Sequence, residues 1–196
     1  EAENRLFHFS GMGYDAAVLN DYYLFKQRFG QGLLAPWVKG IAGYITALLL
    51  KSAPENLLRD PPTMRVVNGG SPVYAMDEDG VPHELPVGPG DIVYEGPVTV
   101  TGAGTTTSYG YGFRACPFAD TREGYFNFRI ISARVLECLS HAPSIFRGTY
   151  RAPSFQDFLA RDLTLEFDRP VPYQIGGDSQ GYRERLDYRT SDISVD

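Results

Sequence analysis

Glycine and proline interrupt this chain so often that long helices are disfavoured over most of its length. There are 21 glycines and 14 prolines, and they separate short stretches rich in aromatic residues, with 13 tyrosines and 12 phenylalanines in all. Aromatic residues favour strands, whereas glycine and proline are typical of the turns between strands. The pattern favours many short strands over a helical bundle. We therefore expect a mainly β, sandwich-like fold of antiparallel sheets with short helical additions.

One segment departs from this pattern. The apolar residues from Trp37 to Leu50 follow helical spacing, with Pro36 in the first turn and Pro54 beyond the end, so we expect one long helix there. Shorter helical segments are expected at 132–139 and 155–160. Strands are expected at 6–9, 64–67, 72–76, 81–85, 92–94, 97–100, 126–131, 163–167, 173–175 and 182–186, with a hairpin turn at 77–80. The expected core contains Phe7, Phe9, Trp37, Ile41, Ile45, Leu48, Val66, Val98, Val135, Leu163, Leu165, Phe167 and Ile175.

Length and charge limit what the chain can bind. At 196 residues it suits a single domain, 1–196. The formal net charge of −6 argues against a nucleic-acid partner, which would require a basic surface. No apolar run reaches the roughly 18 residues of a membrane span. Two cysteines, Cys116 and Cys138, are too few for a disulfide framework, so we expect a cytoplasmic protein.

Two short segments at opposite ends of the chain each place a carboxylate just past a predicted strand. Near the start, residues 9–16 (FSGMGYDA) indicate a strand, a glycine turn and Asp15. Near the end, residues 170–178 (PVPYQIGGD) form an alternating run that ends in two glycines and Asp178. Side chains at such positions are held in place and still reach solvent. Structural alternatives stay open for both segments, because Asp15 is also a favourable helix N-cap and Gly-Gly-Asp is also a plain hairpin turn.

Taken together and in this order, the two segments resemble the second, C-terminal domain of the diacylglycerol kinase and sphingosine kinase family of lipid kinases. The resemblance extends from about Phe7 to Leu186. It implies ATP and Mg²⁺ as cofactors of the intact protein. It further implies that Asp15 faces the lipid headgroup, and that Asp178 assists the metal ion. Lys26 and Arg28 resemble in position the basic residues with which relatives meet nucleotide phosphates.

The chain departs from this family in two ways. Relatives usually carry V-D-G-E where this chain has Ile175-Gly176-Gly177-Asp178, so Gly176 replaces one carboxylate and Asp178 replaces the longer glutamate. Relatives also begin with a nucleotide-binding domain whose G-G-D-G-T loop holds phosphates and the proposed general base, and this sequence has no such loop. Because the chain also starts at Glu1 with neither Met nor a signal peptide, we expect the second half of a kinase.

The resemblance therefore implies a domain of an enzyme that transfers the γ-phosphoryl group of ATP to a hydroxyl of a diacylglycerol-like lipid. The chain alone, with no catalytic residue of its own, should be inactive without its N-terminal domain. A non-catalytic lipid- or isoprenoid-binding module, or a degenerate kinase scaffold, is the alternative that Gly176 favours. Expected partners are the lipid substrate, the N-terminal domain and, transiently, a membrane surface. With a net charge of −6, peripheral membrane contact should be local and apolar.

Overall fold

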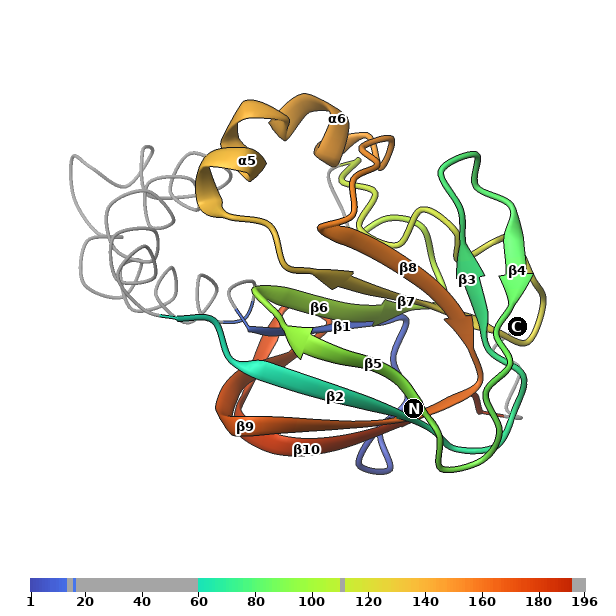
Figure 1. Cartoon of the computed structure of the whole chain (residues 1–196). Coiled ribbons are helices and arrows are strands. Elements are labelled where there is room, and N and C mark those ends of the chain that lie inside the picture. Colours follow the sequence, from blue (N-terminus) through green and yellow to red (C-terminus); the bar gives the residue numbers. More distant parts are fainter. Residues whose placement is uncertain (14–15, 17–59, 110–111, 192–196) are drawn as a thin grey trace.

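Antiparallel strands dominate the structure, a computed structural model that describes residues 1–13, 16, 60–109 and 112–191 (Figure 1). The strands are β1 (Phe9–Gly13), β2 (Thr63–Asn68), β3 (Tyr74–Met76), β4 (Pro82–Glu84), β5 (Ile92–Pro97), β6 (Val100–Gly104), β7 (Phe126–Ile131), β8 (Phe155–Ala160), β9 (Asp162–Ile175) and β10 (Asp178–Arg189). Two short helices, α5 (Val135–Ser140) and α6 (Ala142–Phe146), lie between β7 and β8. The predicted mainly β fold is confirmed, but the long helix expected at 37–50 lies outside the described residues. Within the described ranges, no helix is long and apolar enough to cross a membrane.

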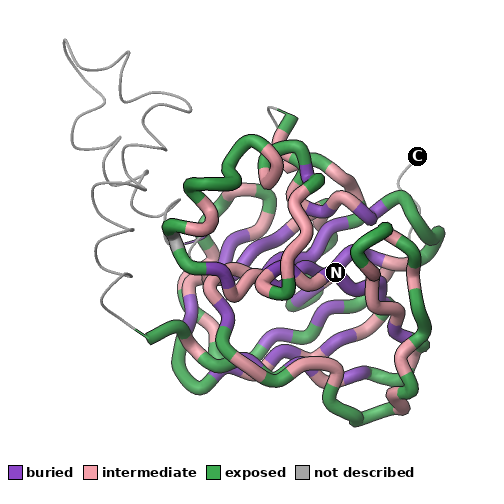
Figure 2. Tube along the Cα trace, turned by 45° about the horizontal axis from the view of Figure 1, so that its top comes forward, coloured by how far each residue is buried: buried purple, intermediate pink, exposed green. Residues whose placement is uncertain are grey.

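The strands of the described residues form one sheet that curls on itself (Figure 1). Its order is β4-β3-β8-β7-β6-β1-β9-β2-β5, and β10 pairs with the other edge of β9. The curl brings together strands that are not neighbours in the sheet. Tyr188 of β10 packs against Phe126 and Phe128 of β7, with ring centroids 6.1 and 6.3 Å apart. The apolar core therefore lies inside the curl, in a sandwich-like arrangement (Figure 2).

Most of the predicted core residues that the structure describes belong to this core. The buried ones are Val66, Val98, Leu163, Leu165 and Phe167. Phe7 and Ile175 are half-buried and pack against the buried cluster. Phe9 is also half-buried, and its ring stacks on that of Tyr109 with centroids 4.1 Å apart. Outside the description lie Trp37, Ile41, Ile45, Leu48 and the side chain of Val135.

The glycine-rich segment near the start was expected to form a turn after a strand at 6–9, and this prediction is wrong. The segment is itself a strand, β1, which pairs with β6 on one side and with β9 on the other. Glycine is needed because the backbones lie close together. A Cβ on Gly102 of β6 would lie 2.6 Å from the hydroxyl of Tyr109 and 2.9 Å from the carbonyl oxygen of Ser10. These glycines therefore permit a close approach of strands.

Residues 155–160, expected as a helical turn, form strand β8 between β3 and β7. Their apolar positions fit helical spacing, but an ion pair with the neighbouring strand decides the outcome. Arg129 of β7 donates from Nε and Nη2 to the two carboxylate oxygens of Asp157, at 2.9 and 2.8 Å. Asn127 donates to the same carboxylate at 3.0 Å. Because Arg129 and Asp157 are each only 5% exposed, each charge needs the other, and local spacing does not reveal such a partner.

β9 runs unbroken through Pro170 and Pro172, where a bend was expected. The two prolines lie where the strand changes neighbours, since residues 163–167 pair with β2 and residues 173–175 pair with β1. Between these stretches that edge of β9 has no ladder partner in the described part of the chain, so a residue without an N–H group is tolerated. The strand expected at 97–100 instead straddles the turn from β5 to β6.

Asp157→Asn tests the ion pair that fixes β8. It leaves the buried guanidinium of Arg129 without its counter-charge, so we expect the free energy of unfolding to fall by about 3 kcal/mol or more. Urea denaturation followed by circular dichroism measures the change. Glu95→Gln is the control, because Glu95 and Arg65 form an exposed ion pair of 2.9 Å. Its free energy of unfolding should barely change. Equal effects of the two substitutions would show that the buried pair does not stabilise β8.

Candidate functional site

The second motif forms a tight hairpin loop of two residues. Gly176 and Gly177 connect β9 to β10 with φ angles of +59° and +89°, and Ile175 pairs with Asp178 across the loop. Positive φ at both central residues is typical of a type I′ turn, which matches the twist of the paired strands. The N–H of Gly177 also donates to Oε1 of Gln174 at 2.7 Å. Two adjacent glycines thus fix the position from which Asp178 leaves the loop.

This hairpin is attached to the first motif. The N–H of Gly176 donates to the carbonyl oxygen of Phe9 at 3.1 Å. β1 and β9 are paired, with Ser10 opposite Ile175 and Met12 opposite Tyr173. Segments from opposite ends of the chain are therefore neighbours in the sheet. A single site that is built from both motifs requires this adjacency.

Asp178 lies at the start of β10, and its side chain is exposed. Its carboxylate makes no hydrogen bond or ion pair with any residue in the described ranges. Its backbone carbonyl accepts a hydrogen bond from Nε2 of Gln180 at 3.2 Å. An exposed carboxylate on a tight hairpin can accept hydrogen bonds from a ligand or bind a cation.

A complete metal site is not formed by the described residues. No group of three or more His, Cys, Asp or Glu side chains among them is arranged to hold a metal ion. Mg²⁺ needs only one or two protein carboxylates when substrate phosphates supply the other ligands. Asp178 therefore fits an auxiliary role toward Mg²⁺. Gly176 contributes no ligand, although no atom lies within 4 Å of the position its Cβ would take.

Asp15, Lys26 and Arg28 lie outside the described residues, so their roles stay predictions. β1 ends at Gly13, which pairs with Val100. At about 3.3 Å per residue, this end is about 13 Å from Phe9, where the hairpin is attached. The hairpin and the segment that leads to Asp15 thus begin at opposite ends of one short strand.

A depression of about 460 Å³, which no sequence motif indicated, opens beside the N-terminal segment. Its lining combines aromatic residues with exposed arginines, among them Phe7, Phe126, Tyr188, Arg122 and Arg189. The guanidinium of Arg122 lies over the rings of Tyr74 and Tyr125, 4.2 and 4.9 Å from their centroids. These cation–π contacts hold a positive charge at the edge of an apolar surface. The spacing of residues in the sequence does not indicate this depression, because its lining comes from segments that are far apart in the chain.

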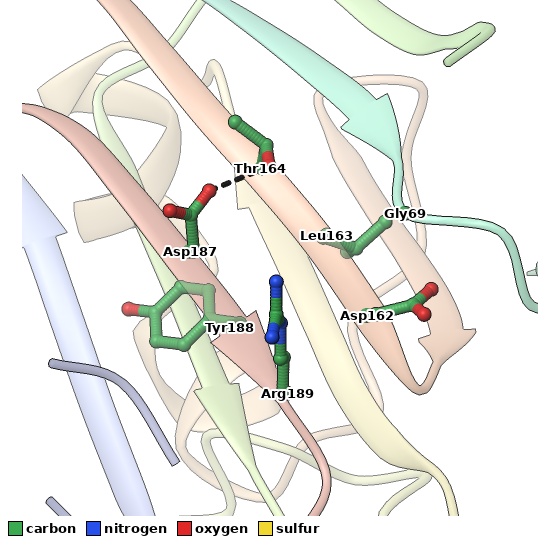
Figure 3. A pocket seen from close by; sticks show the side chains of 7 residues that line it. All are labelled: Gly69, Asp162, Leu163, Thr164, Asp187, Tyr188 and Arg189. Atoms are coloured by element: carbon green, nitrogen blue, oxygen red, sulfur yellow. Dashed lines mark hydrogen bonds between the residues drawn. The ribbon is translucent and has the colours of Figure 1, made fainter. Parts of the chain in front are cut away.

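A second depression of about 330 Å³ lies over β9 and β10 (Figure 3). Its two carboxylates already have partners. Asp187 accepts a hydrogen bond from Oγ1 of Thr164 at 2.6 Å, and Asp162 accepts one from the N–H of Ser71 at 3.2 Å. Both hydrogen bonds join neighbouring segments and occupy the carboxylates. This depression is therefore a weaker candidate for a ligand site than the one beside the N-terminal segment.

Two buried tyrosines of β9 and β10 stay protonated. Burial raises the pKa of Tyr188 well above its ordinary value, and it raises the pKa of Tyr173 as well. The hydroxyl of Tyr188 accepts a hydrogen bond from Oγ of Ser10 at 2.8 Å. The hydroxyl of Tyr173 has no hydrogen-bond partner among the residues described. Neutral phenols of this kind supply apolar surface and no charge for catalysis.

Gly176→Asp would add a second carboxylate at this point of the hairpin. We expect the free energy of unfolding to change by about 1 kcal/mol or less, because the position is open and aspartate is accepted in type I′ turns. Gly13→Asp is the matched control. Gly13 also has positive φ, +88°, but its Cβ would lie 2.5 Å from the carbonyl oxygen of Thr99, so we expect a loss of about 3 kcal/mol. Urea denaturation decides, and a large loss for Gly176→Asp would contradict the open hairpin.

No family model matches the sequence, and no curated protein matches it either. Solved structures that resemble the fold include a diacylglycerol kinase from Bacillus anthracis, with a TM-score of 0.44 and 11% identity over 97% of this chain and 49% of that one. Two proteins from the same organism, assigned as diacylglycerol kinases, are 12% identical, with TM-scores of 0.43 and 0.44, over 96% of this chain and 52% of theirs. The chain thus spans about half the length of these proteins.

Proposed function

We propose that this chain is the C-terminal, lipid-binding domain of a lipid kinase, which transfers the γ-phosphoryl group of ATP to a hydroxyl of a diacylglycerol-like lipid. The observation that carries the proposal is the pairing of β1 with β9. It places the Gly176–Gly177 hairpin at one end of the strand whose other end leads to Asp15. One strand thus connects the segment that carries the proposed lipid-facing carboxylate to the hairpin that carries the proposed nucleotide-facing one.

The roles of the site residues follow from their chemistry. Asp15 orients the lipid, because a carboxylate accepts hydrogen bonds from hydroxyl groups. Lys26 and Arg28 meet nucleotide phosphates, Lys26 as a point charge and Arg28 through a fork of donors. Asp178 assists Mg²⁺, which neutralises phosphate charge when it is bound with ATP.

The general base and the phosphate-binding loop belong to an N-terminal nucleotide-binding domain, which we propose as the partner of this chain. Phosphoryl transfer depends mainly on positioning and charge neutralisation. A domain that holds the lipid and one acidic group is therefore useful only when the nucleotide is presented to it. Because the lipid resides in a bilayer, the assembly also works in transient contact with a membrane surface.

A second candidate function is a non-catalytic lipid- or isoprenoid-binding module, or a kinase scaffold that has lost catalysis. Gly176 favours it, because position 176 has room for a carboxylate and yet carries none. The depression lined by Phe7, Phe126 and Tyr188 offers apolar surface to a lipid in either case.

The chain by itself should show no ATP-dependent lipid phosphorylation, because the nucleotide loop and the base lie elsewhere. Incubation with radiolabelled ATP, Mg²⁺ and diacylglycerol in detergent micelles measures this. Supplying the N-terminal domain, as a continuous protein, should restore turnover. Robust phosphorylation by the chain alone would contradict the proposal that the general base and the nucleotide loop belong to a separate N-terminal domain.

Asp178→Asn in the two-domain protein separates the two candidate functions. The substitution keeps the shape of the side chain and removes its charge. If Asp178 positions the metal or the nucleotide, turnover should fall about 10²-fold, while the melting temperature stays nearly unchanged because the exposed carboxylate has no described partner.

Glu184→Gln is the matched control, since Glu184 is an exposed acid of the same strand and should leave turnover unchanged. Equal activity of Asp178→Asn and the wild type would reduce Asp178 to a turn residue. A large fall in melting temperature would instead show that its carboxylate stabilises the local backbone.

A further inference from the structure

The helices α5 and α6 stand out from the curled sheet (Figure 1). They expose apolar side chains to solvent. Leu136 and Leu139 of α5 are 70% and 45% exposed, and Phe146 of α6 is 44% exposed. Leu136 and Leu139 are three residues apart, so they share one side of α5. We call α5 and α6, together with the adjoining Arg134 and Arg147, the helical tip.

The charge of the helical tip is opposite to that of the whole chain. Arg134 and Arg147 flank the two helices, and both are exposed. The single acidic residue between them, Glu137, is half-buried and accepts hydrogen bonds from the hydroxyl of Tyr150, at 3.2 Å, and from Oγ of Ser154. The outward surface therefore presents cations and apolar groups, although the chain as a whole has a net charge of −6.

A row of aromatic rings braces the tip against the sheet. Phe146 stacks on Phe113 at 5.7 Å, Phe113 meets Tyr109 at 6.1 Å, and Tyr109 stacks on Phe9 of β1 at 4.1 Å. The backbone N–H of Arg114 donates to the backbone carbonyl oxygen of Phe146 at 3.0 Å, so another exposed basic residue is joined to α6. The exposed ring of Phe146 is thus held in place, so presenting it to a partner costs little conformational entropy.

The geometry points to the helical tip as a docking surface for an anionic lipid bilayer. Short helices that combine exposed leucine and phenylalanine with flanking basic residues lie at the boundary between headgroups and acyl chains. Basic residues add attraction to anionic headgroups within a Debye length. An acidic protein is repelled by such a surface elsewhere, so charge complementarity orients it with the tip toward the bilayer. The inference rests on the proposed function, because a lipid kinase must reach a substrate that resides in a membrane.

Co-sedimentation with vesicles tests this without any catalysis. We expect the chain to bind vesicles of equimolar phosphatidylglycerol and phosphatidylcholine, and to bind phosphatidylcholine alone more weakly. Leu136→Ser/Leu139→Ser should weaken partitioning about tenfold, since it removes most of the apolar surface that α5 can insert. The control Val81→Ser/Ile92→Ser alters side chains of comparable exposure, 49% and 47%, away from the tip, and it should bind as the wild type does.

Arg134→Glu tests the electrostatic contribution to the binding of anionic vesicles. Arg134 precedes α5 and makes no side-chain capping bond, and a negative charge is favoured near a helix N-terminus. The variant should therefore fold normally and, because its charge changes by two units, bind anionic vesicles about 30-fold less well. Arg161→Glu makes the same change of charge at an exposed position at the other end of β8 and should have a much smaller effect.

Absence of wild-type binding to anionic vesicles, or equal weakening by the control variants, would overturn the inference. So would a dimer in size-exclusion chromatography that Leu136→Ser/Leu139→Ser abolishes while vesicles stay unbound, because a second copy would then cover the tip. Phosphorylation of a short-chain diacylglycerol in micelles by the two-domain protein is measured separately. If the wild-type two-domain protein binds vesicles but does not phosphorylate the short-chain diacylglycerol, the kinase assignment is refuted and the docking surface is supported.

Discussion

The whole arrangement depends on β1, a strand of five residues that is hydrogen-bonded to both halves of the curled sheet. β6 and the strands beyond it lie on one side, and β9 with its neighbours lies on the other. Glycine at two positions of this ladder avoids contacts that a side chain would make. A Cβ would lie 2.5 Å from the carbonyl oxygen of Thr99 at Gly13 and 2.9 Å from that of Ser10 at Gly102, so a side chain at either position would force the backbone to shift.

The same strand connects the parts to which we assign function. The carbonyl oxygen of Phe9 receives the N–H of Gly176, so the hairpin with Asp178 is fixed to β1 by its backbone. The ring of Phe9 stacks on Tyr109 and begins the aromatic row that reaches α6. At the other end, Gly13 leads toward Asp15. One short strand thereby connects the hairpin of Asp178 to the aromatic row of the helical tip, and in the sequence its far end precedes Asp15 by two residues.

The local pattern of apolar and turn-forming residues was enough to predict the regular strands and the hairpin turns. The alternation at 126–131 and 163–167 has a period of two, and Asp77 to Gly80 closes the hairpin between β3 and β4 as expected. It failed where distant partners decide the structure. The apolar spacing of 155–160 is compatible with a helix, and only the buried ion pair with Arg129 selects a strand. The sequence also predicted the glycine turn that precedes Asp178, but the depression that includes Arg122 is lined by segments that only tertiary packing brings together.

The tight hairpin fixes the backbone at position 176, so a carboxylate there would be held in place. A carboxylate on a flexible loop loses conformational entropy when it binds a metal ion, whereas one on a type I′ turn is already placed. Asp178 has this advantage, and position 176 offers it too, because both φ and free space accept aspartate there. The backbone therefore accepts a second carboxylate at position 176, although the chain carries glycine there. Under the proposed function, Asp178 alone serves the metal from this hairpin, and more of the coordination of Mg²⁺ falls to the nucleotide phosphates.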